Sequence, residues 1–242
     1  MTSASASSAG APSAAGGPAA PAVSLLLIRH GETEWNAAAR IQGFRDIALS
    51  PRGQQQAQHL AQALAGEPIE AVYTSELGRA IETARPLAQR LGLDLRVDMR
   101  LRERGFGIFE GHTYEEAEAR WPNEYAIWKR REPGYALPEG GESYLAGRER
   151  VFAFLQDIAR LHEGSTIAVV THGGPIRSVM KMLADGRLRT TRNHPPVEVN
   201  SVINCAILRL RARRFPTGVR WRMECVNDAS HLHEMVPEPV QE

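Results

Sequence analysis

Near its start the chain passes directly from an apolar run to a polar cluster, in the stretch Leu25-Leu26-Leu27-Ile28-Arg29-His30-Gly31-Glu32-Thr33-Glu34-Trp35-Asn36. The apolar residues predict a short buried strand of the kind found in the middle of a parallel sheet. In open α/β sheets the ligand crevice lies just beyond the carboxyl ends of the strands, so Arg29 and His30 are expected at the mouth of a crevice. Gly31 permits a turn there, and Thr33 is suited to cap a following helix whose free N–H groups favour an anion.

Strands and helices alternate along most of the chain. Strands are predicted at about 23–29, 69–73, 93–97 and 165–170, followed by two late strands at 197–210 and 219–226 that a basic turn joins. Helices are predicted at about 51–64, with Ser50 as the N-cap, and at 142–161, 175–183 and a segment that ends near 91. Two shorter helical pieces, near 113–120 and 123–131, fall in an aromatic-rich segment. This alternation predicts an α/β fold with a mainly parallel sheet and a small lobe over the crevice.

Composition and charge exclude several classes of protein. The formal net charge of the 242 residues is +1, which gives no general electrostatic case for binding nucleic acid or an anionic membrane. No run approaches the roughly 18–20 apolar residues that span a bilayer. Residues 1–22 have neither the basic start nor the apolar stretch of a secretory signal. We therefore expect a cytoplasmic protein with no nucleic-acid partner and no membrane partner.

The domain organisation is predicted to be simple. Residues 1–22 are almost entirely Ala, Ser, Gly and Pro, which offer little apolar area to offset the entropy of ordering, so we predict a disordered tail. Residues 23–242 are predicted to form one domain, with the lobe at about 104–141. Cys205 and Cys225 are the only cysteines, lie in apolar surroundings and are expected to be buried free thiols rather than metal ligands.

Four polar clusters follow strands or turns, and together they resemble the motifs of one family. The first, Arg29-His30-Gly31-Glu32-Thr33-Glu34-Trp35-Asn36, fits the pattern R-H-G-x-[ST]-x-x-N without departure. The others are Leu77-Gly78-Arg79-Ala80, Arg102-Glu103-Arg104-Gly105 and Val170-Thr171-His172-Gly173-Gly174. In this order they resemble the histidine phosphatase superfamily, also called phosphoglycerate mutase-like, over about residues 23–232. The resemblance implies a three-layer α/β/α sandwich with a helical lobe over the active site.

The resemblance also implies a role for each matched residue. His30 resembles the nucleophile, Glu103 the general acid and His172 the second histidine of the site. Arg29 and Arg79 resemble the arginines that bind the transferring phosphoryl group. The same group of phosphate-binding residues is expected to include Asn36, Gln42, Gly43 and Gly173.

The chemistry explains why these residue types are needed. A phosphate monoester is doubly negative and repels a nucleophile unless its charge is neutralised, and arginine matches phosphate oxygens in a bidentate way. Arg29, Arg79 and a protonated His172 are expected to supply three positive groups, so no metal and no cofactor is expected. His30 must attack as a neutral imidazole, with its other ring nitrogen donating to a backbone carbonyl that the sequence does not identify.

The predicted function is that of a phosphomonoesterase, which transfers a phosphoryl group from a small-molecule phosphate monoester to a histidine and then to water. Relatives with mutase activity have a Tyr where this chain has Phe106, and a longer lobe, so both departures favour hydrolysis. Arg130 and Arg131 partly resemble the mutase lobe, which keeps a cofactor-dependent phosphoglycerate mutase as the alternative; a non-catalytic protein that binds phosphorylated ligands is a third reading. The substrate depends on 104–141 and the loop at 186–200. The sequence identifies neither the substrate nor the oligomeric state, monomer or homo-oligomer.

Overall fold

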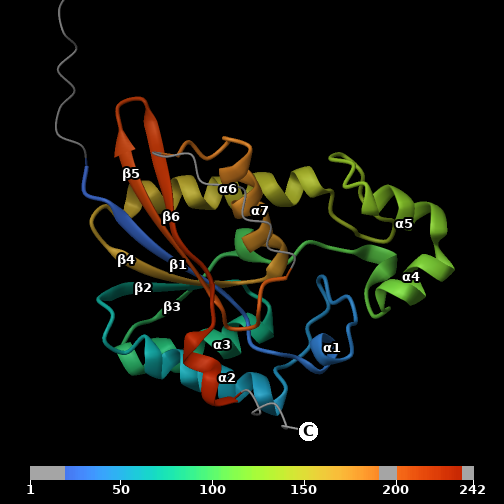
Figure 1. The fold of residues 1–242 in the computed structure, drawn as a ribbon, viewed down its shortest axis with the longest axis horizontal. Coiled ribbons are helices and arrows are strands. Elements are labelled where there is room, and N and C mark those ends of the chain that lie inside the picture. The colour runs from blue at the N-terminus through green and yellow to red at the C-terminus, as the bar shows by residue number, and fades with distance from the viewer. Residues whose placement is uncertain (1–19, 191–200, 236–242) are drawn as a thin grey trace, which may run out of the picture.

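A six-stranded sheet forms the middle of the molecule (Figure 1). The computed structural model describes residues 20–190 and 201–235. The strands stand in the order β3-β2-β4-β1-β5-β6, and their bounds are β1 Val23–Arg29, β2 Ile69–Thr74, β3 Leu95–Val97, β4 Thr166–Thr171, β5 Ile207–Phe215 and β6 Gly218–Asp228. β3, β2, β4 and β1 pair in parallel, whereas β5 runs antiparallel to both of its neighbours. The predicted mainly parallel sheet is confirmed.

Helices cover both faces of the sheet and complete the three predicted layers. α2 (Pro51–Ala63) and α3 (Gly78–Leu91) lie on one face, and α6 (Tyr144–Leu161) and α7 (Gly173–Ala184) lie on the other (Figure 1). Successive residues of β1 point to opposite faces, as the pleat of a strand requires. Leu25 therefore packs into the cluster under α6 and α7, while Leu26 packs into the cluster above α2 and α3. Both residues are buried, which explains the continuous apolar run.

Two helices begin at capping residues that the sequence predicts. Ser50 accepts a hydrogen bond from Gly53 N at the start of α2, and Pro51 occupies the first helical position. Thr33 caps the short helix α1 (Glu34–Ala37). The helix predicted from residue 142 starts two residues later, because Ser143 is its N-cap.

A small lobe with a core of its own stands beside the sheet (Figure 1). It contains α4 (Tyr114–Arg120) and α5 (Pro122–Lys129), which confirms the two predicted helical pieces. Its centre is the fully buried Phe109, which contacts the rings of Trp121, Tyr125 and Trp128. Single 3₁₀ turns at Met99–Leu101 and Gly107–Phe109 lead into the lobe, and a longer 3₁₀-helix, Ser230–Met235, lies near the C-terminus.

Two predicted strands differ from the observed ones. The strand predicted from residue 93 covers only Leu95–Val97. The strand predicted at 197–210 instead spans Ile207–Phe215, and 197–200 lie outside the described residues. Cys205 has a φ of 58°, which interrupts extended backbone just before β5. The basic run predicted as a turn is strand, because buried Leu210 and Ala212 alternate with exposed arginines.

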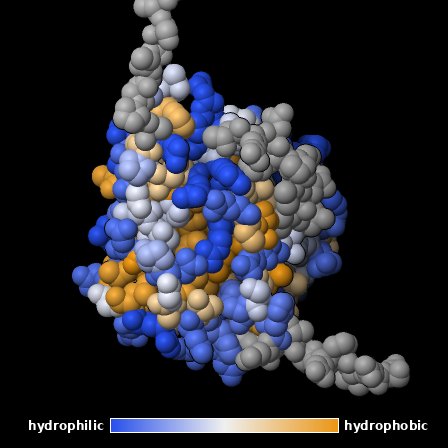
Figure 2. All heavy atoms as spheres, turned by 60° about the vertical axis from the view of Figure 1, so that its left-hand side comes forward, coloured by the Kyte–Doolittle hydropathy of each residue, from blue (hydrophilic) through white to orange (hydrophobic). Residues whose placement is uncertain are grey.

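The face turned forward in Figure 2 carries hydrophilic residues together with hydrophobic areas near its middle and at its lower left. Within the described part of the chain, no helix is long and apolar enough to cross a membrane. Cys205 is buried and Cys225 half-buried, and both are free thiols. Residues 1–19 of the predicted tail and most of the loop at 186–200 lie outside the described residues, so both remain predictions.

Candidate active site

Two neighbouring strands bring the two motif histidines together. β1 and β4 run in parallel with Arg29 paired to Thr171, so the next residues along each strand, His30 and His172, follow in register. His30 N donates to Thr171 O at 2.9 Å, which continues the ladder beyond the last residue of the strand. The ring centroids lie 5.1 Å apart, and the side chains are 3% and 0% exposed. The strand ends thus place two imidazoles at one point of the crevice.

His30 is held in one tautomer by its own chain neighbour. Its Nδ1 lies 2.7 Å from Gly31 O, to which it donates, so this carbonyl is the acceptor that the sequence left unidentified. Burial lowers the pKa of His30 well below its usual value, and the charges of Arg79 and Arg29 lower it further, against the opposing hydrogen bond to Gly31. The imidazole is therefore neutral at pH 7 and carries a free lone pair on Nε2, which is the form that can attack phosphorus.

His172 is also neutral in this arrangement of protein charges. Burial lowers its pKa well below the usual value, and the charge of Arg79 adds to the effect. The predicted third positive charge on His172 therefore depends on a bound phosphate and stays a prediction. Neither ring nitrogen has a hydrogen-bond partner among the described residues. A phosphate dianion beside the ring would raise this pKa, because an opposite charge favours the protonated form.

Two arginines stand beside the histidines without a carboxylate partner. Arg79 is fully buried and donates Nη1 to Arg45 O at 2.6 Å and Nη2 to Gly43 O at 2.9 Å. Arg29 donates to Val202 O. Burial lowers the pKa of Arg79 and lowers that of Arg29 to about 10, so both stay charged at neutral pH. Neither forms a salt bridge with a described residue, so no carboxylate neutralises these two cations and their charge is available to an anion.

Glu103 is fixed at the N-terminus of α7, next to His172. Its Oε1 accepts from Arg104 N at 2.8 Å and its Oε2 accepts from Gly174 N at 3.1 Å. Its backbone carbonyl accepts from Arg150 Nη2 at 2.9 Å, which anchors the segment to α6. A side chain at 174 would collide with this carboxylate, since a Cβ there would lie 2.0 Å from Oε1.

The predicted residues converge on one cavity of about 110 Å³. Its walls include eight of the nine predicted site residues, namely Arg29, His30, Asn36, Gln42, Gly43, Arg79, Glu103 and Gly173. The ninth, His172, is not among the lining residues, but its ring packs against that of His30. Asn36 Oδ1 accepts hydrogen bonds from Thr33 N and Thr33 Oγ1, so the amide N–H groups of Asn36 remain for a ligand. Among the described residues no group of three His, Cys, Asp or Glu side chains is placed to hold a metal ion.

The surroundings of this cavity also include residues that were not predicted as site residues, among them Tyr114, Arg177 and Asn204. Tyr114 and Arg177 line its wall, and Asn204 donates to His30 O at 2.9 Å and to Asn36 Oδ1 at 3.3 Å. Arg177 lies one helical turn after Gly173, so the period of the helix could have indicated it. Tyr114 and Asn204 depend on tertiary packing and carry no local signal.

Comparisons with known proteins show which family the chain resembles. The profile of the histidine phosphatase superfamily, branch 1, matches residues 25–217. The chain is 37% identical over 212 residues to phosphoglycerate mutase-like protein 4 of Arabidopsis thaliana, covering 87% of each chain. It is 33% identical to a metal-independent phosphoserine phosphatase of the same plant, covering 86% of this chain and 82% of the relative.

A solved structure shows the same fold. The structure of a mycobacterial glucosyl-3-phosphoglycerate phosphatase superposes with a TM-score of 0.72 at 29% identity, covering 86% of this chain and all of the other (100%). The family profile covers most of the chain, and its residues include all nine predicted site positions. This chain belongs to the histidine phosphatase superfamily, branch 1.

Proposed function

We propose that the protein is a phosphomonoesterase that transfers a phosphoryl group from a small phosphorylated metabolite to His30 and then to water. The observation that carries the proposal is the neutral His30, with Nε2 free, beside the charged Arg29 and Arg79 in one cavity. Relatives named as phosphatases, among them the metal-independent phosphoserine phosphatase, support the same reaction class.

The reaction then has two steps. In the first, His30 Nε2 forms a bond to phosphorus while the bond from phosphorus to the ester oxygen breaks, and Glu103, as the carboxylic acid, gives its proton to that oxygen. In the second, the Glu103 carboxylate takes a proton from water as the water oxygen bonds to phosphorus and the bond to Nε2 breaks. Arg29 and Arg79 bind the phosphoryl oxygens in both steps and offset their charge.

Phosphoglycerate mutase activity is the second candidate function. The relative named phosphoglycerate mutase-like protein 4 and the cationic lobe, with Lys129, Arg130 and Arg131, favour it. The compact lobe and Phe106 favour hydrolysis. Assays of 3-phosphoglycerate with and without 2,3-bisphosphoglycerate distinguish the two, because a mutase gives 2-phosphoglycerate and a phosphatase gives inorganic phosphate.

Trapping of the phosphoenzyme tests the proposed function. Rapid quench of the wild type with ³²P-labelled nitrophenyl phosphate should give an acid-labile, base-stable phosphoprotein, whereas His30→Ala should give none and should lose turnover. His233→Ala, which changes an exposed histidine, is the matched control and should behave as the wild type. A labelled His30→Ala protein, or a protein that binds phosphate without any turnover, would refute the role of His30 as the nucleophile.

A further inference from the structure

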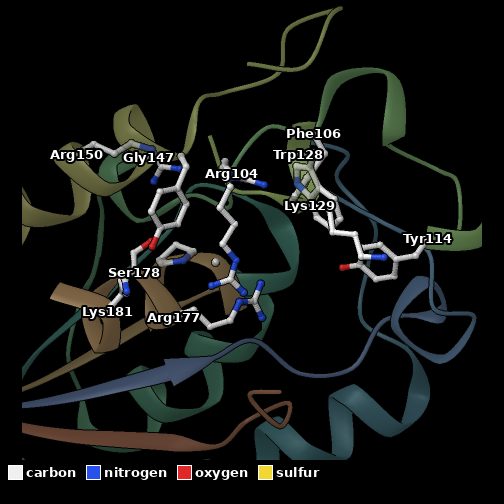
Figure 3. Close-up of a pocket in the computed structure, with 14 residues that line it drawn as sticks. Arg104, Phe106, Tyr114, Trp128, Lys129, Gly147, Arg150, Arg177, Ser178 and Lys181 are labelled. Atoms are coloured by element: carbon white, nitrogen blue, oxygen red, sulfur yellow. The ribbon is translucent and has the colours of Figure 1, made fainter. Parts of the chain in front are cut away.

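A second, larger cavity adjoins the phosphate cavity. It has a volume of about 330 Å³ and shares three wall residues with the smaller one, Phe106, Tyr114 and Arg177. Figure 3 shows its walls, which come from the segment entering the lobe, from α5, from the start of α6 and from α7. A substrate whose phosphate lies against His30 would therefore extend its remaining atoms into this space.

The larger cavity is lined by cations and by no acid. Six of its fourteen lining residues are Arg or Lys, and none is Asp or Glu. Arg150 is neutralised by Glu142 at 2.7 Å, but Arg104, Arg177 and Lys181 form no salt bridge with a described residue. Like charges held close together without a salt bridge repel one another, and an anion between them would relieve this repulsion.

Helix geometry and ring stacking hold these cations in place. Gly174, Arg177 and Lys181 are spaced at three and four residues along α7, so they share one face of the helix, and this face lines the cavity. From the opposite wall, Arg104 lies over the ring of Phe106 at 4.7 Å. Its guanidinium group is directed toward that of Arg177 (Figure 3).

The surroundings of Arg104 support the same conclusion. Burial lowers the pKa of Arg104, and the charge of Arg177 adds to this against the opposing charge of Glu103. Trp128 also lines the cavity, and its buried indole N–H has no acceptor among the described residues. The walls thus offer hydrogen-bond donors and positive charge.

We propose that this second cavity binds a second anionic group of the substrate, so that the substrate class is a small phosphate monoester that also carries a carboxylate or a further phosphate. Arg104 and Lys181 hold that group, and Arg177 lies between it and the transferring phosphate. The inference rests on the proposed function of the neighbouring cavity, and it adds a preference that a general phosphomonoesterase does not have.

Two matched substrate pairs test this inference. 3-Phosphoglycerate and glycerol 3-phosphate differ in a carboxylate, and fructose 1,6-bisphosphate and fructose 6-phosphate differ in a phosphate. For wild type, kcat/KM should be at least about tenfold higher for the more anionic member of one pair, since hydrogen bonds to charged groups are the strong ones. The pair that shows the preference identifies the second anion as carboxylate or phosphate.

Variants then assign the preference to residues. Arg104→Gln and Lys181→Gln should each reduce the ratio of kcat/KM within that pair by about ten- to a hundredfold. Arg160→Gln is the control, because it removes the same charge from an exposed position of α6 outside the cavity, and it should leave the ratio unchanged. Thermal melts of all three variants confirm that they fold.

The outcomes separate this inference from the proposed function. Equal kcat/KM within both pairs, or no turnover of any of the four while nitrophenyl phosphate is hydrolysed, overturns the second anion site and leaves the phosphatase standing. A preference that both Gln variants retain overturns the residue assignment. If nitrophenyl phosphate is not hydrolysed, the phosphatase proposal fails, and calorimetric binding of 3-phosphoglycerate against glycerol 3-phosphate still decides the cavity.

Discussion

Replacement of Gly174 by alanine is predicted to displace the Glu103 carboxylate without harming the fold. A Cβ at 174 would lie 2.0 Å from Glu103 Oε1, whereas ordinary contact begins at 3.4 Å, so the carboxylate must move by about 1.4 Å. The obstacle is the end of a flexible side chain rather than backbone. Gly174 lies in α7, and alanine favours a helix over glycine by up to about 1 kcal/mol. The melting temperature should therefore stay level or rise.

The expected loss is one of rate for substrates that need a proton donor. A misplacement of about 1 Å can cost about 10²-fold, and loss of a general acid typically costs about 10²–10⁴-fold. We expect kcat of Gly174→Ala to fall by about 10²-fold or more for glycerol 3-phosphate. The loss should be much smaller for nitrophenyl phosphate, because nitrophenolate leaves without protonation.

Steady-state assays of both substrates, with melting curves, test this prediction. Gly66→Ala is the control, since a Cβ there meets nothing within 4 Å, and it should retain wild-type rates. Full activity of a folded Gly174→Ala protein on glycerol 3-phosphate would show that Glu103 is not the proton donor at the observed position.

Three other properties can be measured directly. Because burial lowers the pKa of His30 and His172 in the folded state, the unfolded chain binds more protons on acidification. The free energy of unfolding measured in urea should be highest above about pH 6.5 and should fall below that pH by up to about 1.4 kcal/mol per pH unit per histidine. If His172→Gln left the slope of this free energy against pH unchanged, the explanation would be wrong. Hydrolysis of nitrophenyl phosphate should continue in the presence of EDTA. If EDTA abolished the activity and a divalent cation restored it, the metal-independent mechanism would be wrong. Deletion of residues 2–22 should leave the melting temperature and kcat nearly unchanged, because β1 begins at Val23; a large drop in either would show that the tail docks.

Sequence reasoning succeeded where the signal is local. The apolar run before Arg29, the N-cap at Ser50 and the order of strands and helices all reflect preferences of a few neighbouring residues. The position of His30 at a strand end follows from the same run, since the carboxyl ends of parallel strands share one edge of a sheet. The acceptor that fixes its tautomer, the carbonyl of Gly31, is also a chain neighbour, although the sequence alone did not identify it.

What could not be predicted depends on tertiary packing. The neutrality of His172 requires knowledge of its complete burial and of the nearby Arg79. Arg104 lines the larger cavity only because the chain turns into the lobe over Phe106. The length of β5 was misjudged because its exposed arginines resemble a polar turn, although their alternation with buried Leu210 indicates a strand.

The pairing of β1 with β4 also has a consequence for how the protein acquires activity. The two strands are adjacent in the sheet but are separated by α2, α3, the lobe and α6 in the chain. Closing so long a loop is slow, and pairings distant in sequence tend to form late in folding. His30 and His172 can meet only after this pairing forms, so a ribosome-bound chain that ends before β4 has no phosphate site. During refolding, regain of turnover should therefore accompany formation of the central sheet and follow the appearance of helical structure.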